Sequence, residues 1–438
     1  MFERVFKLSE HKTTVKTEVM AGITTFMTMA YILAVNPSVL GSTGMDTTAV
    51  LLATALASCL GTLCMAFMAN LPFALSAGMG LNAFMAYTVV AGYGYSWQVA
   101  LLAVFIEGLL FIVLSLTNVR EAIFNAIPLT LKKGVSVGIG LFIAFIGLQN
   151  SGLCVDSATL VGIISFPENF HTAGICALLT LIGLFFTAVF YTRKMKGAIL
   201  YGILLTWILG MLCQVTGLYV PTPDAGFYSL FPSWGMTDFS KLGLTFGQCF
   251  NVDFSAVGIV NFIVVIFSFL FVDIFDTLGT LIGVATKAKM LDKDGKLPGI
   301  KPALLADSIA TSAGAILGTS TTTTFVESAS GVAVGGRTGL TALVTGILFL
   351  VSTLFAPIFT AIPSFATAPA LIMVGFLMVG TVTEINFDLD NLTESIPAYL
   401  AIIAMPLFYS ISEGISLGVI SYVLLNVAAG KGKKVAPL

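Results

Sequence analysis

Three carboxylates lie in stretches of the chain that are otherwise apolar. Asp273 and Asp276 belong to the run 260–285, and Glu327 follows the polar run 320–324. An ionised side chain is costly inside a bilayer, so by default such residues mark a substrate or proton path. The β-branched, polar residues before Glu327 fit an extended segment better than a helix. A broken helix beside an acid is how secondary transporters build binding sites at the bilayer midplane.

Asp273 and Asp276 are three residues apart, so they share one face of a helix. In a low dielectric, two carboxylates this close do not both ionise easily, and a proton-coupling group requires that property. The alternative is an acid pair satisfied by neighbouring Ser and Thr hydroxyls. Asp307 in the following apolar segment and Thr280 are expected to brace the site from behind. Glu107 is the weakest candidate among the acids and is interpreted as structural or as a relay.

Glu327 is predicted to start a short half-helix. A carboxylate there can cap free N–H groups and also offer an oxygen to a ligand N–H; the alternative is a purely structural cap. Asn82 occupies the matching region of an earlier short segment and offers both a donor and an acceptor, although a satisfied structural amide explains it as well. The remaining predicted substrate-binding residues are Thr25, Phe73, Phe325 and Ser328.

The composition indicates a polytopic α-helical membrane protein. The chain is 57% hydrophobic and only 10% charged, whereas soluble domains have about 25% charged residues. Its net charge of −2 and the lack of a dense basic tract give no sign of a nucleic-acid partner. The six cysteines form no CxxC pair and the two histidines are far apart, so neither a metal site nor a disulfide framework is expected. We expect no cofactor and no enzyme activity, because Walker A, Rossmann and catalytic Ser motifs are missing.

Fourteen apolar segments are predicted, of which the third and the tenth are short. A fourteen-crossing arrangement with both termini in the cytoplasm places every Lys and Arg except Lys241 on the cytoplasmic side of the cell membrane, as the positive-inside rule requires. A twelve- or thirteen-crossing arrangement would move whole clusters of basic residues to the wrong side. The segments are 18–35, 48–70, 77–92, 97–116, 131–149, 173–191, 198–217, 256–285, 302–318, 327–335, 340–359, 368–382, 395–410 and 413–429.

A weak internal repeat relates the two halves. Phe73-Ala-Leu-Ser-Ala-Gly78 matches Phe325-Val-Glu-Ser-Ala-Ser330, at the start of segments 3 and 10. Seven segments followed by seven place the halves in opposite orientations, which predicts an inverted repeat with a site at the repeat interface. The expected fold is therefore an all-α polytopic membrane protein, a 7+7 inverted repeat in which segments 3 and 10 each carry a strand. The two strands can pair and satisfy their own N–H groups; the alternative is that both are loops.

Several longer motifs are distributed along the chain. They are Thr17-Glu-Val-x-Ala-Gly-Ile-Thr-Thr25, Ala30-Tyr-Ile-Leu-x-Val-Asn-Pro37, Gly78-Met-Gly-Leu-Asn-Ala-Phe84, Asp273-Ile-Phe-Asp-Thr-Leu-Gly-Thr-Leu-Ile-Gly283, Ala306-Asp-Ser-Ile309 and Phe325-Val-Glu-Ser-x-Ser-Gly-Val-x-Val-Gly-Gly-Arg-Thr-Gly339. Together they resemble a known family, the AzgA-like purine nucleobase permeases of the nucleobase–ascorbate (NCS2) group, and the resemblance extends from residue 1 to the tail.

The resemblance implies a core domain, in two halves at 1–117 and 256–359, and a gate domain, in two halves at 118–217 and 360–438. It also implies a homodimer and proton symport of adenine, guanine or hypoxanthine. The acids that hold the base in uracil- and xanthine-type relatives correspond here to Asp276 and Glu327. Relatives usually carry Glu at the first of these positions, so Asp276 departs from the pattern. Its shorter side chain either leaves room for a two-ring substrate or shifts the role partly to Asp273.

The residues agree with a neutral, flat, hydrogen-bonding ligand. Carboxylates supply acceptors, and we expect no Arg or Lys within the membrane to pair a phosphate or an organic anion. The nearby pair of Asp273 and Thr277 favours hypoxanthine or guanine, because a second acid suits the N1–H and N2–H₂ edge of an oxopurine. The alternatives are a permease for another base, uracil or xanthine, and a passive channel.

Overall fold

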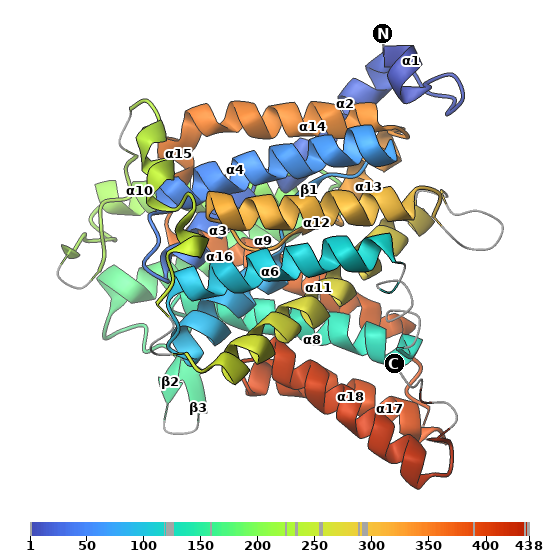
Figure 1. Ribbon diagram of the computed structural model, residues 1–438. Coiled ribbons are helices and arrows are strands. Elements are labelled where there is room, and N and C mark those ends of the chain that lie inside the picture. The colour runs from blue at the N-terminus through green and yellow to red at the C-terminus, as the bar shows by residue number, and fades with distance from the viewer. Residues whose placement is uncertain are drawn as a thin grey trace.

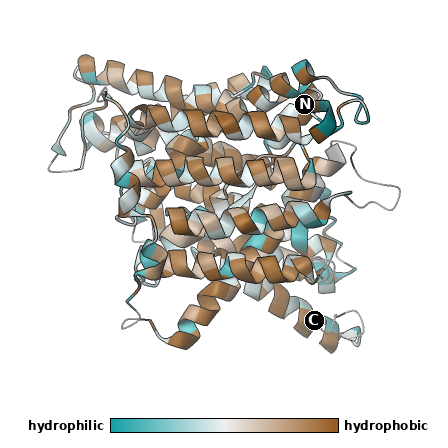
Figure 2. Ribbon diagram, turned by 45° about the horizontal axis from the view of Figure 1, so that its top comes forward, coloured by the Kyte–Doolittle hydropathy of each residue, from teal (hydrophilic) through white to brown (hydrophobic). Residues whose placement is uncertain are grey.

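The computed structural model describes residues 2–438 except 118, 120–126, 158–159, 224–225, 233–234, 254–256, 288–289, 291–296, 389, 433–434 and 436–438. The helices α4, α6, α12 and α14 run nearly parallel, whereas α18 is inclined to them (Figure 1). α14 and α4 lie at one edge of the bundle and α17 and α18 at the other, and both termini lie at the same end of the helices. Hydrophobic residues cover most of the helical surface, whereas the N-terminal segment is hydrophilic (Figure 2).

The first half of the chain ends with α10 and contains three strands among its described residues. Its elements are α1 (Phe2–Phe6), α2 (Val15–Met29), α3 (Ile32–Gly41), α4 (Thr47–Cys64), η1 (Met65–Ala69), β1 (Leu75–Ala77), α5 (Met79–Ala83), η2 (Phe84–Gly92), α6 (Trp97–Leu116), α8 (Leu129–Asn150), β2 (Cys154–Ser157), β3 (Leu160–Ile163), η3 (Phe170–Gly174), α9 (Ile175–Thr192) and α10 (Ala198–Val215).

The second half follows a long connection whose described residues form short 3₁₀ turns and one isolated β-bridge, between Thr222 and Phe227. Its elements are η5 (Phe239–Leu244), η6 (Gln248–Phe250), α11 (Ile259–Lys287), α12 (Ile300–Leu317), β4 (Thr322–Thr324), α13 (Ser328–Val334), α14 (Gly339–Ser352), η7 (Thr353–Phe355), α15 (Ala356–Thr360), α16 (Ser364–Val379), η8 (Gly380–Glu384), α17 (Leu392–Leu407) and α18 (Ile411–Ala428).

The described residues contain 11 helical stretches that are long and apolar enough to cross a membrane, and the shorter apolar helices Met79–Gly92 and Leu392–Leu407. With the seven-residue helix α13, every one of the fourteen predicted segments contains a helix. The hairpin of β2 and β3 was not predicted. The predicted domain boundaries at 118 and 256 lie outside the described residues.

The helices pack as two sets. In the first, α12 packs against α4 and α6, and α14 against α2 and α4; in the second, α8 packs against α16 and α17, and α9 against α10 and α16. α11 contacts both sets, through α6 on one side and through α8 and α18 on the other. Glycines permit the closest approaches, because a Cβ on Gly140 of α8 would lie only 2.7 Å from the carbonyl oxygen of Gly375 in α16.

The two short strands pair inside the bundle, as predicted. β1 runs antiparallel to β4, with Ser76 opposite Thr323. Two further backbone bonds extend the ladder: Gly78 N–H donates to the Thr321 oxygen and Phe325 N–H to the Ala74 oxygen, both at 3.0 Å. Both strands are fully buried. Pairing satisfies their backbone groups, the condition under which non-helical backbone is tolerated at membrane depth.

Candidate functional site

A cavity of about 360 Å³ lies where the paired strands give way to the half-helices α5 and α13. Its volume falls within the range of about 300–1,000 Å³ that is usual for small-molecule sites. It is lined by Tyr31, Gly78, Met79, Gly80, Lys132, Ser136, Ile139, Phe275, Asp276, Thr280, Val284, Thr323, Thr324, Phe325, Val326, Glu327, Val374, Leu377, Met378, Thr381 and Glu384.

Glu327 is the residue that precedes α13, but its side chain makes no capping hydrogen bond. Its Oε1 accepts a hydrogen bond of 2.8 Å from the hydroxyl of Tyr31, which lies between α2 and α3. One turn away, the hydroxyls of Thr28 and Ser330 lie 2.9 Å apart and fasten α2 to α13. The carboxylate is thus oriented from outside its own helix, beside a cavity that it lines.

Asp276 reaches the same cavity from α11. Its Oδ2 accepts a hydrogen bond of 3.2 Å from the hydroxyl of Thr323 in β4. Gly78 makes this approach feasible, because a Cβ on that residue would lie 2.9 Å from the Thr323 hydroxyl and 3.1 Å from the Asp276 carboxylate. Asp276 is therefore held by the middle residue of β4, and Glu327 follows three residues after the end of the same strand.

Asp273 and Asp307 lie behind the cavity and do not line it. Both are fully buried. The hydroxyl of Thr277 lies 2.7 Å from Asp273 Oδ1 and 3.3 Å from both carboxylate oxygens of Asp307. The two predicted acids on one helix face thus have different surroundings: Asp276 faces the cavity, while Asp273 faces α12. Thr280, expected behind the site, is among the lining residues.

Four other predicted substrate-binding residues are fully buried and are not among the lining residues. Asn82 accepts a hydrogen bond from the hydroxyl of Ser320, and Ser328 accepts one of 3.0 Å from the backbone N–H of Ala74. Thr25 packs against α13 at Gly331, and Phe73 belongs to the apolar core. In this structure they join the strands and half-helices, whereas Phe325 lines the cavity.

Sequence reasoning did not single out Thr323, and Tyr31 entered it only as part of the motif 30–37. Tyr31 donates a hydrogen bond to Glu327 and Thr323 donates one to Asp276, so both residues belong to the site. A strand was predicted at this position, and successive side chains of a strand point to opposite faces. This alternation was the signal that could have identified Thr323. Lys132, which was expected on the cytoplasmic side, also lines the cavity, from the first turn of α8.

The cavity opens at one end of the helices. Lining residues run from Ile139 to Lys132 toward the start of α8, and from Phe275 to Val284 toward the end of α11. The lining also includes Glu384, an exposed residue that pairs with Lys133 at 3.3 Å. No described lining residue of α8 follows Ile139. The opening therefore faces the end at which α8 begins.

The arrangement can hold a small ligand that donates hydrogen bonds. The two carboxylates supply acceptors, and Phe275 and Phe325 supply apolar surface. Among the described residues, no group of three or more His, Cys, Asp or Glu side chains is arranged to hold a metal ion.

Comparison with known proteins gives consistent results. Residues 16–417 match the family Xan_ur_permease, described as the permease family. The guanine/hypoxanthine permease PbuO of Bacillus subtilis is 45% identical over 99% of this chain and 96% of its own. The adenine permease AdeP of Escherichia coli is 42% identical over 100% of this chain and 93% of its own. The fold is similar to that of the murine anion transporter Slc26a9 in its inward-facing state, with a TM-score of 0.63 at 14% identity, covering 94% of this chain and 68% of that one.

Proposed function

The chain belongs to this permease family, and we propose that it imports purine nucleobases across the cell membrane by proton symport. The observation that carries the proposal is the pair of carboxylates, Asp276 and Glu327, on the wall of one cavity within an apolar helical bundle. Relatives of similar length are permeases for guanine and hypoxanthine or for adenine. The substrate is accordingly a purine base, with hypoxanthine and guanine favoured.

Recognition follows from the hydrogen bonds that the acids already make. Tyr31 donates to one oxygen of Glu327, and Thr323 donates to one oxygen of Asp276. A carboxylate accepts at both oxygens, so each acid retains acceptor capacity for an N–H group of the base. Oxopurines present such groups on the pyrimidine edge and on the imidazole ring. Phe275 and Phe325 line the cavity and offer apolar faces to the flat ligand.

Transport requires the cavity to face the two sides of the membrane in turn. The helix sets correspond to a core domain, 1–117 and 256–359, and a gate domain, 118–217 and 360–438, in a fourteen-crossing inverted repeat. Their separate packing supports this division. Rocking of one such unit against the other around a central site is how transporters of this architecture alternate. Both termini lie in the cytoplasm, as the distribution of Lys and Arg favours.

The coupled proton resides on the acids of α11. Asp276 is at the cavity wall, and Asp273, three residues earlier, is fully buried. A proton on this pair removes a bare charge from the moving domain, because an ionised carboxylate in hydrocarbon is costly. Glu327, which is held by the Tyr31 hydroxyl, then remains as the acceptor for the base.

Uptake of radiolabelled hypoxanthine by cells that lack their own purine permeases tests the function. Unlabelled guanine, hypoxanthine, adenine and uracil are added as competitors. We expect competition by the purines and little by uracil, together with loss of accumulation when a protonophore is added. Competition by uracil alone would favour the pyrimidine alternative. Flux that does not saturate and ignores the pH gradient would favour a channel.

A further inference from the structure

An aromatic cluster joins the two helix sets on the far side of the cavity from its opening. Its centre is Tyr409, in the turn between α17 and α18. The ring of Tyr409 meets those of Phe142, Phe145 and Tyr87 at centroid distances of 5.4, 5.9 and 6.1 Å. All three contacts are edge-on, with interplanar angles of 74°, 75° and 80°, the geometry that aromatic pairs prefer.

Two hydrogen bonds reinforce the cluster across the same junction. The hydroxyl of Thr88 in η2 donates to the backbone oxygen of Tyr409 at 3.1 Å. The amide of Asn150, the last residue of α8, donates to the hydroxyl of Tyr87 at 2.8 Å. Tyr87 and Thr88 continue the half-helix that starts at the cavity, whereas Asn150 and Tyr409 belong to the second helix set. Each bond therefore connects one set to the other.

The backbone at Tyr409 is unusual. Its φ is 54°, in the left-handed region that a bulky residue rarely adopts. Such conformations persist only where the surroundings hold them, and they concentrate at functional and switch regions. Here the three rings and the bond from Thr88 hold the residue in place.

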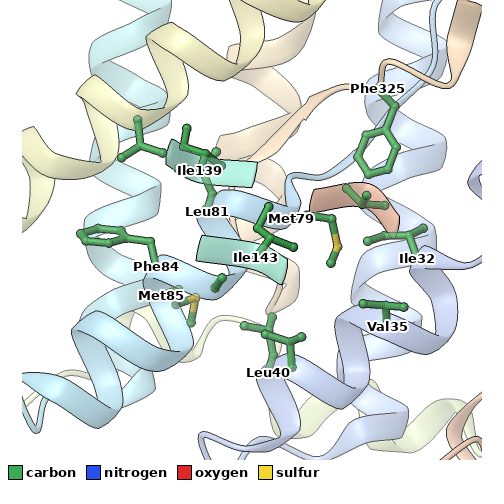
Figure 3. Close-up of a cluster of buried hydrophobic side chains, with 14 of the residues drawn as sticks. Ile32, Val35, Leu40, Met79, Leu81, Phe84, Met85, Ile139, Ile143 and Phe325 are labelled. Atoms are coloured by element: carbon green, nitrogen blue, oxygen red, sulfur yellow. The ribbon is translucent and has the colours of Figure 1, made fainter. Parts of the chain in front are cut away.

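A layer of apolar side chains fills the space between the cavity and this cluster. Ile139 and Ile143 of α8 belong to the same buried cluster as Leu81 and Met85 of the half-helix (Figure 3). Ile143, Leu81 and Met85 are buried. Since an α-helix rises about 1.5 Å per residue, the stretch from Ile139 to Asn150 makes a barrier about 16 Å thick. A ligand in the cavity has an apolar, closed path on this side and an open one on the other.

We propose that Tyr409, Tyr87 and Thr88 form the outer gate of the transporter. The inference rests on the proposed function, because a gate has meaning only if the cavity alternates between the two sides. In this structure the gate is closed and the cavity opens toward the cytoplasm. Entry of a base from outside requires η2 to separate from the turn at Tyr409, which breaks the cluster and both hydrogen bonds.

The test measures access to the barrier from outside the cell. Ile143→Cys is introduced into a variant whose six native cysteines are replaced by alanine, and a membrane-impermeant maleimide is added to whole cells. Tyr409→Gly removes the ring and suits the left-handed backbone, while Thr88→Val removes one bond and keeps the shape. Phe105→Ala is the matched control, because its ring also meets another edge-on, Phe250 at 5.0 Å, but this contact joins α6 to η6 of the connecting segment and does not involve the second helix set.

We expect Tyr409→Gly to raise the labelling rate about tenfold and Thr88→Val to raise it less. Both variants remove contacts made only in the closed state, which shifts the population toward the open state. Phe105→Ala should leave the rate unchanged. Labelling that stays at the parental rate in both gate variants, or rises equally in the control, would overturn the proposal. Hypoxanthine binding by the purified parent is measured separately. Its absence would refute the proposed function, whereas the labelling rates would still decide whether this junction opens.

Discussion

Glu327→Gln is the most direct test of the site. The substitution keeps the size of the side chain and exchanges one acceptor oxygen for an NH₂ donor. The oxygen of the amide can still accept the bond of 2.8 Å that Glu327 receives from Tyr31. In that orientation the new NH₂ group takes the place of the second carboxylate oxygen, where it meets the N–H of the base.

The magnitude follows from the unmade hydrogen bond. A buried donor left without an acceptor costs about 1–3 kcal/mol, which corresponds to a loss of about 5- to 150-fold in affinity. Tyr31→Phe should cost less, because it removes the donor that orients Glu327 but leaves the carboxylate. If the two side chains act through each other, the double variant should lose less than the sum of the single losses.

Titration of the purified protein with hypoxanthine measures these losses as changes in Kd. Glu107→Gln is the matched control: Glu107 is also a fully buried acid and accepts a bond of 2.9 Å from Thr321, but it does not line the cavity. Its Kd should stay within about twofold of the parent, because the Gln oxygen can still accept the bond from Thr321 and the side chain does not reach the cavity. A Kd for Glu327→Gln that matches the parent and this control would refute direct contact between Glu327 and the base.

Further predictions concern coupling and packing. Asp276→Asn mimics the protonated acid, so it should retain hypoxanthine exchange but lose the accumulation that otherwise rises as external pH falls. If accumulation stays pH-dependent in this variant, the coupled proton must be assigned to another acid. Glu18→Gln should lower the stability by about 1.5–3 kcal/mol, because the buried Glu18 carboxylate accepts three backbone N–H bonds at the start of α14; a thermal melt checks this. Gly140→Val should destabilise by about 1–3 kcal/mol, since its Cβ would meet the Gly375 oxygen. Gly380→Ala, in open space, should leave the same melt unchanged.

The fold could be predicted further than the site. Helix-length apolar runs and the placement of Lys and Arg gave segments that each contain a helix, because bilayer thickness dictates segment length. The polar run before Glu327 predicted a strand, and β4 forms there and pairs with β1. The hairpin of β2 and β3 was missed, since its residues lie outside the apolar segments in which membrane patterns operate.

The orientation of single side chains could not be read in the same way. The spacing of Asp273 and Asp276 places both on one helix face, but the rotation of α11 between α6 and α8 decides which acid meets the cavity. That rotation depends on packing between distant segments. Asn82 shows a related limit: its position in a half-helix suggested a ligand contact, whereas its amide is occupied by Ser320 and by the Ala77 oxygen.

The inverted repeat explains why geometry was easier to foresee than chemistry. The strands β1 and β4 are equivalent in backbone and pair symmetrically, but their side chains differ. β1 is Leu75–Ala77, whereas β4 and the residues before it carry hydroxyls that bond to acids on separate helices, Thr321 to Glu107 and Thr323 to Asp276. The first half contributes Gly78, whose missing side chain admits a carboxylate. The repeat therefore fixes where a site can form, while the second half supplies Asp276 and Glu327, and the hydrogen bond from Thr323 links Asp276 to the strand that joins both halves.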